Sequence, residues 1–263
     1  VKSDLESTSI IDNTVSQILP PGGAKNALDC AIWDLTAKRS GKSIYSLLNT
    51  QARPLRTVFT IGVGSIDEMS NTASENKQFP ILKVKLDANK PIEKLEAIRQ
   101  RRPDAKIIVD VNQAWSFLEL KEYLSYCKRL NISMIEQPLP RGHDEQLDGF
   151  SSSVPLGADE SCLHEGEFDI AAQRYDVINI KLDKCGGLTS ALKLVELARA
   201  RNKVIMVGNM VGSSLSMAPA HVIGQFSEFI DLDGPLLLAQ DSTPKMHYSP
   251  NGLVYPPSSS IWG

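Results

Sequence analysis

Short apolar runs alternate with longer amphipathic segments along most of this chain. Eight runs of strand length occupy residues 57–63, 81–86, 106–112, 133–139, 154–161, 176–182, 203–210 and 228–234. Segments of helical length and period lie between them, including 91–102, 116–130 and 188–201. Strands that alternate with helices are typical of parallel sheets. The pattern therefore predicts an α/β fold, a closed (β/α)7β barrel of the TIM type, over residues 53–240.

The two ends of the chain follow other patterns. Residues 1–52 contain no convincing strand and are expected to form a separate, mainly helical unit. An apolar-faced helix is predicted within 27–41, after the turn at 20–23, and Gly41 is placed to end it. Residues 241–263 are rich in proline and serine, and they are expected to form a tail over the surface.

Charged side chains recur at a steady interval at the ends of the predicted strands. Asp110, Glu136 and Asp159 each end an apolar run, and Lys85 and Lys181 continue the series on either side. The successive steps are 25, 26, 23 and 22 residues, the length of a strand, a helix and two loops. The C-terminal ends of barrel strands converge on one mouth. The spacing therefore predicts an acidic cluster flanked by two amines.

Composition narrows the kinds of partner. The chain has 263 residues, 42% hydrophobic content and a net charge of −3, which argues against nucleic acid and favours small molecules. No apolar stretch approaches the roughly 20 residues that cross a bilayer, and no signal-peptide core is present, so no membrane association is expected. The four cysteines lack CxxC spacing, which predicts a reduced, cytoplasmic protein.

A single carboxylate at a strand end is commonly a helix cap or a solvated loop residue. Three of them at one height on consecutive strands form an anionic pocket whose mutual repulsion a divalent cation would relieve. Oxygen donors favour Mg²⁺, with Mn²⁺ as a substitute. Zinc is not expected, because the four histidines lie in helices, loops or the tail: His143, His164, His221 and His247.

The lysine pair at 83 and 85 has two interpretations. An isolated Lys-x-Lys is typical of the polar face of a half-exposed strand. In a barrel, strand alternation turns both side chains, Lys83 and Lys85, into the lumen. Repulsion between the two ammonium groups would lower the pKa of one of them. Lys85 lies nearer the mouth and is expected to act as a base. Lys181 ends the sixth strand and Lys85 the second, so the two are expected to face each other across the mouth.

This arrangement implies a proton-transfer chemistry. A metal bound to a substrate carboxylate stabilises the enediolate that forms when the neighbouring α-proton is removed. One lysine takes the proton and the other returns one from the opposite face. The product has inverted configuration.

The ordered motifs LKVKLD, VDVN, IEQP, GADES, NIKLDKCGG and DLDG, with the helix NALDCAIWDLTAKR, resemble the enolase superfamily in its muconate-lactonizing subgroup. The dipeptide epimerases are the most similar group. The resemblance implies Mg²⁺ ligands at Asp110, Glu136 and Asp159 and an acid/base pair at Lys85 and Lys181. It also implies that residues 1–52 are a remnant of a capping domain whose first third is absent, and that the tail packs on barrel or cap.

The resemblance further assigns the substrate's ammonium group to Asp231 and Asp233, a pair that without it would be interpreted as a turn. Lys83 and Asn112 are expected to orient the catalytic groups, and Glu160 to do likewise. Gly186 and Gly187 form either an anion cradle or, at least as readily, a close turn. Residues 208–214 are expected at the mouth, lining the substrate pocket.

Three functions stay open. The first is a Mg²⁺-dependent dipeptide epimerase acting on the C-terminal residue of a small-molecule dipeptide, with L-Ala-D/L-Glu as the leading substrate. The second is a sister reaction, such as N-acylamino-acid racemisation, o-succinylbenzoate synthesis or muconate cycloisomerisation. The third is a truncated, non-catalytic barrel that binds metal or ligand. The identity of the dipeptide, and whether the chain is a homo-oligomer, stay open as well.

Overall fold

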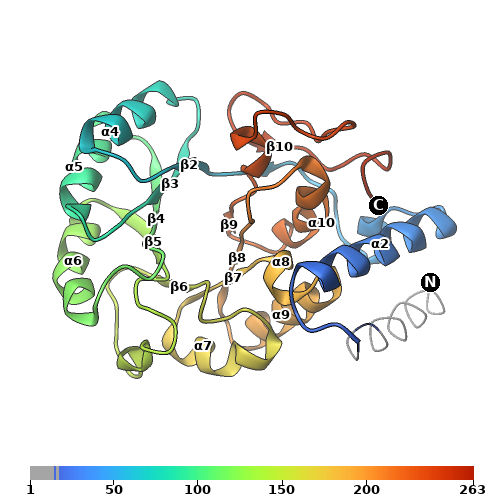
Figure 1. Cartoon of the computed structure of the whole chain (residues 1–263), viewed down its shortest axis with the longest axis horizontal. Helices are drawn as coiled ribbons and strands as arrows, with labels where there is room; N and C mark the ends of the chain where they lie inside the picture. The colour runs from blue at the N-terminus through green and yellow to red at the C-terminus, as the bar shows by residue number, and fades with distance from the viewer. Residues whose placement is uncertain (1–14, 16–17) are drawn as a thin grey trace.

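A ring of parallel strands with helices around it forms the body of the molecule (Figure 1). The computed structural model describes residue 15 and residues 18–263. Eight strands pair in chain order: β2 (Phe59–Ile61), β3 (Ile81–Lys85), β4 (Lys106–Asp110), β5 (Ile132–Glu136), β6 (Leu156–Ala158), β7 (Val177–Ile180), β8 (Val204–Val207) and β9 (Phe229–Ile230). The backbone N–H of Val58 donates to the carbonyl of Ile230 at 2.9 Å, which joins the first strand to the last. The predicted α/β barrel is confirmed.

Helices follow the strands around the outside. They are α4 (Ile66–Glu75), α5 (Pro91–Arg101), α6 (Phe117–Arg129), α7 (Phe168–Arg174), α8 (Leu182–Cys185), α9 (Leu188–Ala200) and α10 (Ser214–Gly224), with short 3-10 turns at Glu145–Leu147, Glu165–Glu167 and Gly234–Leu237. The sequence sets where α6 begins: the Ser116 hydroxyl accepts from the backbone N–H of Glu119, whose carboxylate accepts from Ser116 in return.

Strand alternation divides the side chains between two environments. One set faces outward and packs under the helices in the main core. The other set faces the lumen, whose lower layer is apolar and consists of Val58, Ile108, Met134, Val177, Met206 and Phe229. Two residues further along several of these strands the lumen side chains become charged, because the same alternation brings Asp110, Glu136 and Asp231 to the next layer. The apolar layer closes the floor beneath the charged one.

The segment before the barrel is helical in its described part. Helix α2 (Gly23–Ser40) ends at Gly41, whose φ of 63° lies in the left-handed region, as the sequence predicts. Helix α3 (Ile44–Leu47) follows. Among the described residues up to 52 no strand occurs, in agreement with the prediction. The prediction also covers residues 1–14 and 16–17, which lie outside the described residues. The proposed boundaries at 52 and 240 stay predictions.

Helix α2 packs against the turn between α8 and α9, where Gly186 and Gly187 have φ of 93° and 111°. The carboxylate of Asp29 accepts from the backbone N–H of Thr189 at 3.1 Å and from its hydroxyl at 2.6 Å. A Cβ on Gly187 would collide with this carboxylate. The glycine pair is therefore a close turn, and the anion at the start of α9 is Asp29 of the chain itself.

The C-terminal tail contacts both the barrel entry and α2. Strand β10 (Leu253–Val254) pairs antiparallel with β1 (Leu55–Arg56), a two-residue ladder that the sequence does not predict. The indole N–H of Trp262 donates to the carbonyl of Cys30 at 2.7 Å. In the described part of the chain, no helix has both the length and the apolar character needed to cross a membrane.

Candidate active site

The predicted charged residues meet at the C-terminal end of the barrel. Strand register places Lys85 beside Asp110 and Asp110 beside Glu136. Asp159 follows the last residue of β6, and Lys181 follows β7 as the residue before α8. The structure thus brings together the five residues of the predicted series, which span residues 85–181 of the chain.

Lys83 lies at the centre of the cluster and is 2% exposed. Its Nζ is 3.1 Å from Asp110 Oδ2, 2.8 Å from Glu136 Oε2 and 2.8 Å from Asp231 Oδ2. Burial opposes the charge, but these three carboxylates outweigh it and raise the pKa of Lys83 well above its ordinary value. Lys83 is thus a fixed cation that binds three strands together, not a base.

Lys85 reaches further toward solvent, with 37% of its side chain exposed. Its Nζ donates to Asp110 Oδ2 at 3.0 Å and to Asn112 Oδ1 at 2.8 Å. The backbone N–H of Asn112 also donates to Asp110 Oδ1 at 3.1 Å, so Asn112 holds both partners. Lys83 and Lys85 both pair with Asp110 Oδ2. This shared negative charge offsets the repulsion between the two ammonium groups. The prediction that Lys85 acts as a base depends partly on that repulsion.

Lys181 approaches from the opposite wall. Its Nζ lies 2.8 Å from Asp159 Oδ2 and 3.8 Å from Glu136 Oε1. Although burial works against the charge, Glu136 and Asp159 raise the pKa of Lys181. Lys184, one turn further along α8, donates to Asp159 Oδ1 at 2.6 Å. Lys184 is not among the predicted site residues, although its spacing of three residues from Lys181 on a helix was a signal that could have indicated it.

The carboxylates of the mouth respond differently to this environment. Burial, and then repulsion from Asp110, raise the pKa of Glu136 to about 7. Burial acts in the same direction on Asp110 and Asp159, but contacts with lysines lower the pKa of both. Lysine contacts therefore favour the ionised form of the two end carboxylates of the row, whereas burial disfavours it at the central Glu136.

Asp231 and Asp233 follow β9 and complete the ring. Asp231 pairs with Lys83 and accepts from Asn209 Nδ2 at 2.9 Å. Asp233 Oδ2 accepts from the backbone N–H of Thr60 at 2.7 Å, across the seam between the last strand and the first. Burial and the neighbouring Asp231 raise the pKa of Asp233 to about 7.

The donor set decides whether a metal fits. Among the described residues, no three acidic, histidine or cysteine side chains stand close enough to hold a metal as they are arranged, because lysine ammonium groups lie between the carboxylates. The chemistry nevertheless suits a hard divalent cation. Glu136 Oε2 is buried and accepts no hydrogen bond, although Lys83 Nζ is 2.8 Å away. All the acidic donors here are oxygen atoms, which Mg²⁺ prefers.

Two buried amides beside the carboxylates, those of Gln137 and Asn179, are also absent from the predicted site residues. Gln137 Oε1 accepts from the backbone N–H groups of Asp159 and Ser161, at 3.0 and 3.1 Å, and so ties the end of β6 to that of β5. Asn179 Nδ2 donates to Glu136 Oε1 at 2.7 Å. The sequence around Gln137, which follows Glu136, and around Asn179, two residues before Lys181, has no distinctive local pattern. Their partners lie on other strands, so only the fold reveals these roles.

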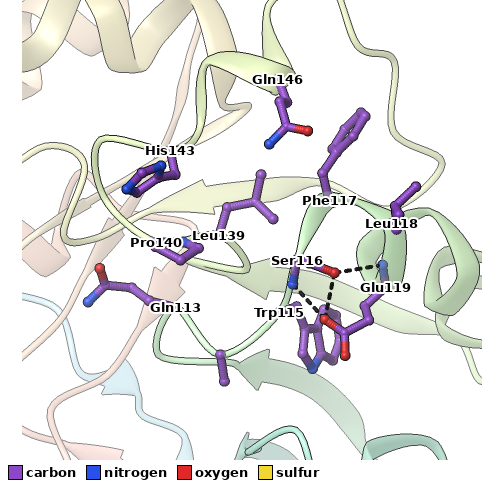
Figure 2. A pocket seen from close by; sticks show the side chains of 11 residues that line it. Gln113, Trp115, Ser116, Phe117, Leu118, Glu119, Leu139, Pro140, His143 and Gln146 are labelled. Carbon is purple, nitrogen blue, oxygen red and sulfur yellow. Dashed lines mark hydrogen bonds between the residues drawn. The ribbon is translucent and has the colours of Figure 1, made fainter.

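A hollow of about 530 Å³ lies outside this cluster, at the start of α6 and in the loop after β5 (Figure 2). Side chains around it include Gln113, Phe117, His143 and Gln146. None of the predicted site residues lines it. The charged groups, not this hollow, mark the candidate site. In the predicted lining segment 208–214, Met210 and Val211 are 51% and 64% exposed, and its contact with substrate stays a prediction.

An eight-strand α/β barrel with carboxylates and lysines on its strand ends defines the class of protein. The model of the family described as enolase C-terminal domain-like matches residues 67–259. That of the mandelate racemase/muconate lactonizing enzyme N-terminal domain matches residues 7–49. The chain therefore belongs to the enolase superfamily, as its motifs indicate.

Similar curated proteins act on amino-acid derivatives. The chain is 42% identical to an N-acetyl-D-glutamate racemase of Pseudoalteromonas sp, over 93% of this chain and 78% of that protein. It is 40% identical to the L-Ala-D/L-Glu epimerase of Escherichia coli (strain K12), over 91% of this chain and 75% of that protein. These relatives are racemases and epimerases, so the predicted enzyme class, an isomerase, is confirmed.

Solved structures lead to the same group. An enolase family member from Agrobacterium tumefaciens with homology to dipeptide epimerases, with bound sodium and L-Ala-L-Glu, has a TM-score of 0.92 and 44% identity, covering 96% of this chain and 77% of that one. A dipeptide epimerase from Cytophaga hutchinsonii, complexed with Mg and D-Ala-L-Val, has a TM-score of 0.86 and 27% identity, covering 92% and 70%. One of these neighbours is thus a dipeptide epimerase and the other a homologue of dipeptide epimerases, and each holds a cation and a dipeptide.

Proposed function

We propose that this protein is a Mg²⁺-dependent dipeptide epimerase that inverts the α-carbon of the C-terminal residue, with L-Ala-D/L-Glu as the first candidate substrate. The observation that carries the proposal is the placement of Lys85 and Lys181. They lie at opposite ends of the row Asp110–Glu136–Asp159, at 3.0 Å from Asp110 and 2.8 Å from Asp159. A neutral amine on one wall, which takes a proton, and an ammonium group on the other, which returns one, are what a proton transfer between two faces of one carbon requires.

The chain's own residues divide the work. Asp110, Glu136 and Asp159 would hold the cation, which when bound supplies positive charge to offset the charge that develops on the substrate carboxylate. Lys85 and Lys181 would exchange protons with the α-carbon, one from each face. Lys83 holds the carboxylates of β4, β5 and β9 in place as a fixed countercharge.

The mouth also offers a place for the substrate's amino group. Asp231 and Asp233 lie together on the seam of the barrel, where burial, and then repulsion from Asp231, raise the pKa of Asp233 to about 7. A substrate ammonium group beside them would relieve this repulsion. That requirement suits a dipeptide with a free N-terminus.

N-acylamino-acid racemisation is the second candidate. Asp231 is already paired with Lys83 and Asn209, and Asp233 accepts from Thr60. Part of the capacity of the two carboxylates to bind a substrate ammonium group is therefore taken up by partners within the protein. A neutral acyl group would need no anionic pair. The similarity to an N-acetyl-D-glutamate racemase points in the same direction.

The two candidates separate in one experiment. The purified protein with Mg²⁺ in D₂O is incubated with L-Ala-L-Glu or with N-acetyl-L-glutamate, and the glutamyl α-proton signal is followed by NMR. Exchange with epimerisation of the dipeptide alone supports the proposal. Exchange of the acetyl compound alone favours the second candidate, and exchange of neither, in a folded protein, contradicts both.

A further inference from the structure

Asn179 is a buried polar residue to which the proposed mechanism gives no part. It lies on β7 two residues before Lys181, so strand alternation turns both side chains into the lumen while Ile178 and Ile180 pack in the outer core. The residue is 2% exposed. A buried side-chain amide normally has hydrogen-bond partners, so the partners of Asn179 indicate its role.

Its amide nitrogen contacts a predicted metal ligand directly. Nδ2 donates to Glu136 Oε1 at 2.7 Å, and because an amide NH₂ can only donate, this contact fixes which end of the amide faces Glu136. The same Oε1 lies 3.8 Å from Lys181 Nζ, while Oε2 lies 2.8 Å from Lys83 Nζ. Asn179 therefore holds one oxygen of Glu136 toward β7 and leaves the other facing β3.

The opposite end of the amide has no hydrogen-bond partner. Asn179 Oδ1 is buried and unpaired, which is unfavourable because this oxygen has lost its hydrogen bonds to water. Gly208, after β8, makes room for it: a Cβ there would lie 2.5 Å from Asn179 Oδ1 and 2.7 Å from Lys181 Cε. Asn179 and the neighbouring Lys181 thus both depend on the absence of a methyl group at Gly208.

We propose that Asn179 is a positioning residue that orients Glu136 for a divalent cation, and that Gly208 is the glycine that permits it. The inference rests on the proposed function, because it takes Glu136 as a metal ligand. A carboxylate held in its binding orientation loses less freedom when the cation arrives, and partners of metal ligands are typically worth about 10–100-fold in affinity.

The test is Mg²⁺ binding measured by titration calorimetry on the whole chain. Asn179→Leu keeps the size of the side chain and removes the donor, and its Mg²⁺ affinity is expected to fall by about 10–100-fold. Activity lost at low Mg²⁺ is expected to return when Mg²⁺ is raised, which a general packing defect would not produce. Met206→Leu, at the register partner of Asn179 in the apolar lumen layer, is the matched control and should bind as the unsubstituted protein does.

Gly208→Ala tests the same contact from the other side. The added methyl displaces Asn179 and Lys181 together, so Mg²⁺ affinity should fall and α-proton exchange should stay low even in excess Mg²⁺. Gly62→Ala is its control, because no atom lies within 4 Å of a Cβ at that position. If Asn179→Leu does not fold, Gly208→Ala carries the comparison.

The outcomes separate the two proposals. Unchanged Mg²⁺ affinity in a folded Asn179→Leu, or in Gly208→Ala where the first variant does not fold, overturns the inference and leaves the proposed function intact. If the unsubstituted protein neither binds Mg²⁺ nor exchanges an α-proton, the proposed function falls and the inference falls with it.

Discussion

Single side chains divide the candidate site into an exposed and a sheltered half. Lys85 is 37% exposed in its side chain and Lys181 is 8% exposed, although both pair with carboxylates at about 3 Å. The sequence could place both lysines because each ends a strand in a regular series. It could not place Gln137 or Asn179, because their roles depend on contacts between strands that have no local pattern.

The two lysines should be separable by the configuration of the substrate. Lys181→Ala is expected to lower epimerisation by about 10³-fold, because one face of the carbon loses its proton donor. Exchange without inversion should survive for the one epimer whose α-proton faces Lys85. NMR in D₂O with L-Ala-L-Glu and L-Ala-D-Glu measures both quantities. Equal loss of exchange for both epimers would contradict a division of faces.

His221 gives a prediction for pH. It is fully buried, its Nδ1 lies 2.6 Å from the hydroxyl of Tyr45, and its Nε2 lies 3.3 Å from the carbonyl of Val254. A carbonyl only accepts, so Nε2 carries the proton and Nδ1 accepts from Tyr45. Burial lowers the pKa of His221 to about 4 from 6.5, so the unfolded state takes up a proton first as pH falls.

This histidine should therefore cost stability in acid. From pH 7 to pH 5 its contribution to the free energy of unfolding is expected to fall by about 2 kcal/mol, and above pH 7 it should not change. Urea unfolding of the unsubstituted protein and of His221→Gln at both pH values measures the difference, since glutamine does not titrate. Equal losses in the two proteins would show that His221 is not the group responsible.

At the scale of elements, hydrophobic periodicity predicted the barrel strands and the main helices. The end of α2 was also predictable, because a single local residue, Gly41, sets it. The pairing of β1 with β10 was not, because each strand has two residues and the partners lie almost 200 residues apart. The docking of α2 on α9 also depends on a distant contact, between Asp29 and Thr189.

That contact is open to a stability test. Asp29→Ala removes two hydrogen bonds at the start of α9 and should lower the free energy of unfolding by about 1–3 kcal/mol. Urea unfolding monitored by circular dichroism gives the value. Asp29→Asn, which keeps an acceptor for Thr189, is the control and should lose less. Gly187→Ala should destabilise as well, because its methyl would strike the Asp29 carboxylate.

At the scale of the whole molecule, a cation bound by the carboxylates of the mouth should raise the free energy of unfolding. A cation that binds only the folded state stabilises it by about 2.7 kcal/mol at 100 times its dissociation constant, which corresponds to roughly 5–10 °C in melting temperature. Thermal melts with Mg²⁺, and again after adding EDTA, measure this shift. Equal melting temperatures with Mg²⁺ and with EDTA would argue against a metal in the mouth.

The seam between the first and last strands has a consequence for synthesis. Thr60 near the start of the barrel donates to Asp233 near its end, and Val58 donates to Ile230. Domains commonly begin to fold while the chain is still being made. A ribosome-bound chain that has not yet released β9 lacks both the closing bond and the aspartate pair. The candidate site therefore becomes complete only after β9 and the two aspartates have emerged from the ribosome, in the same step that closes the ring.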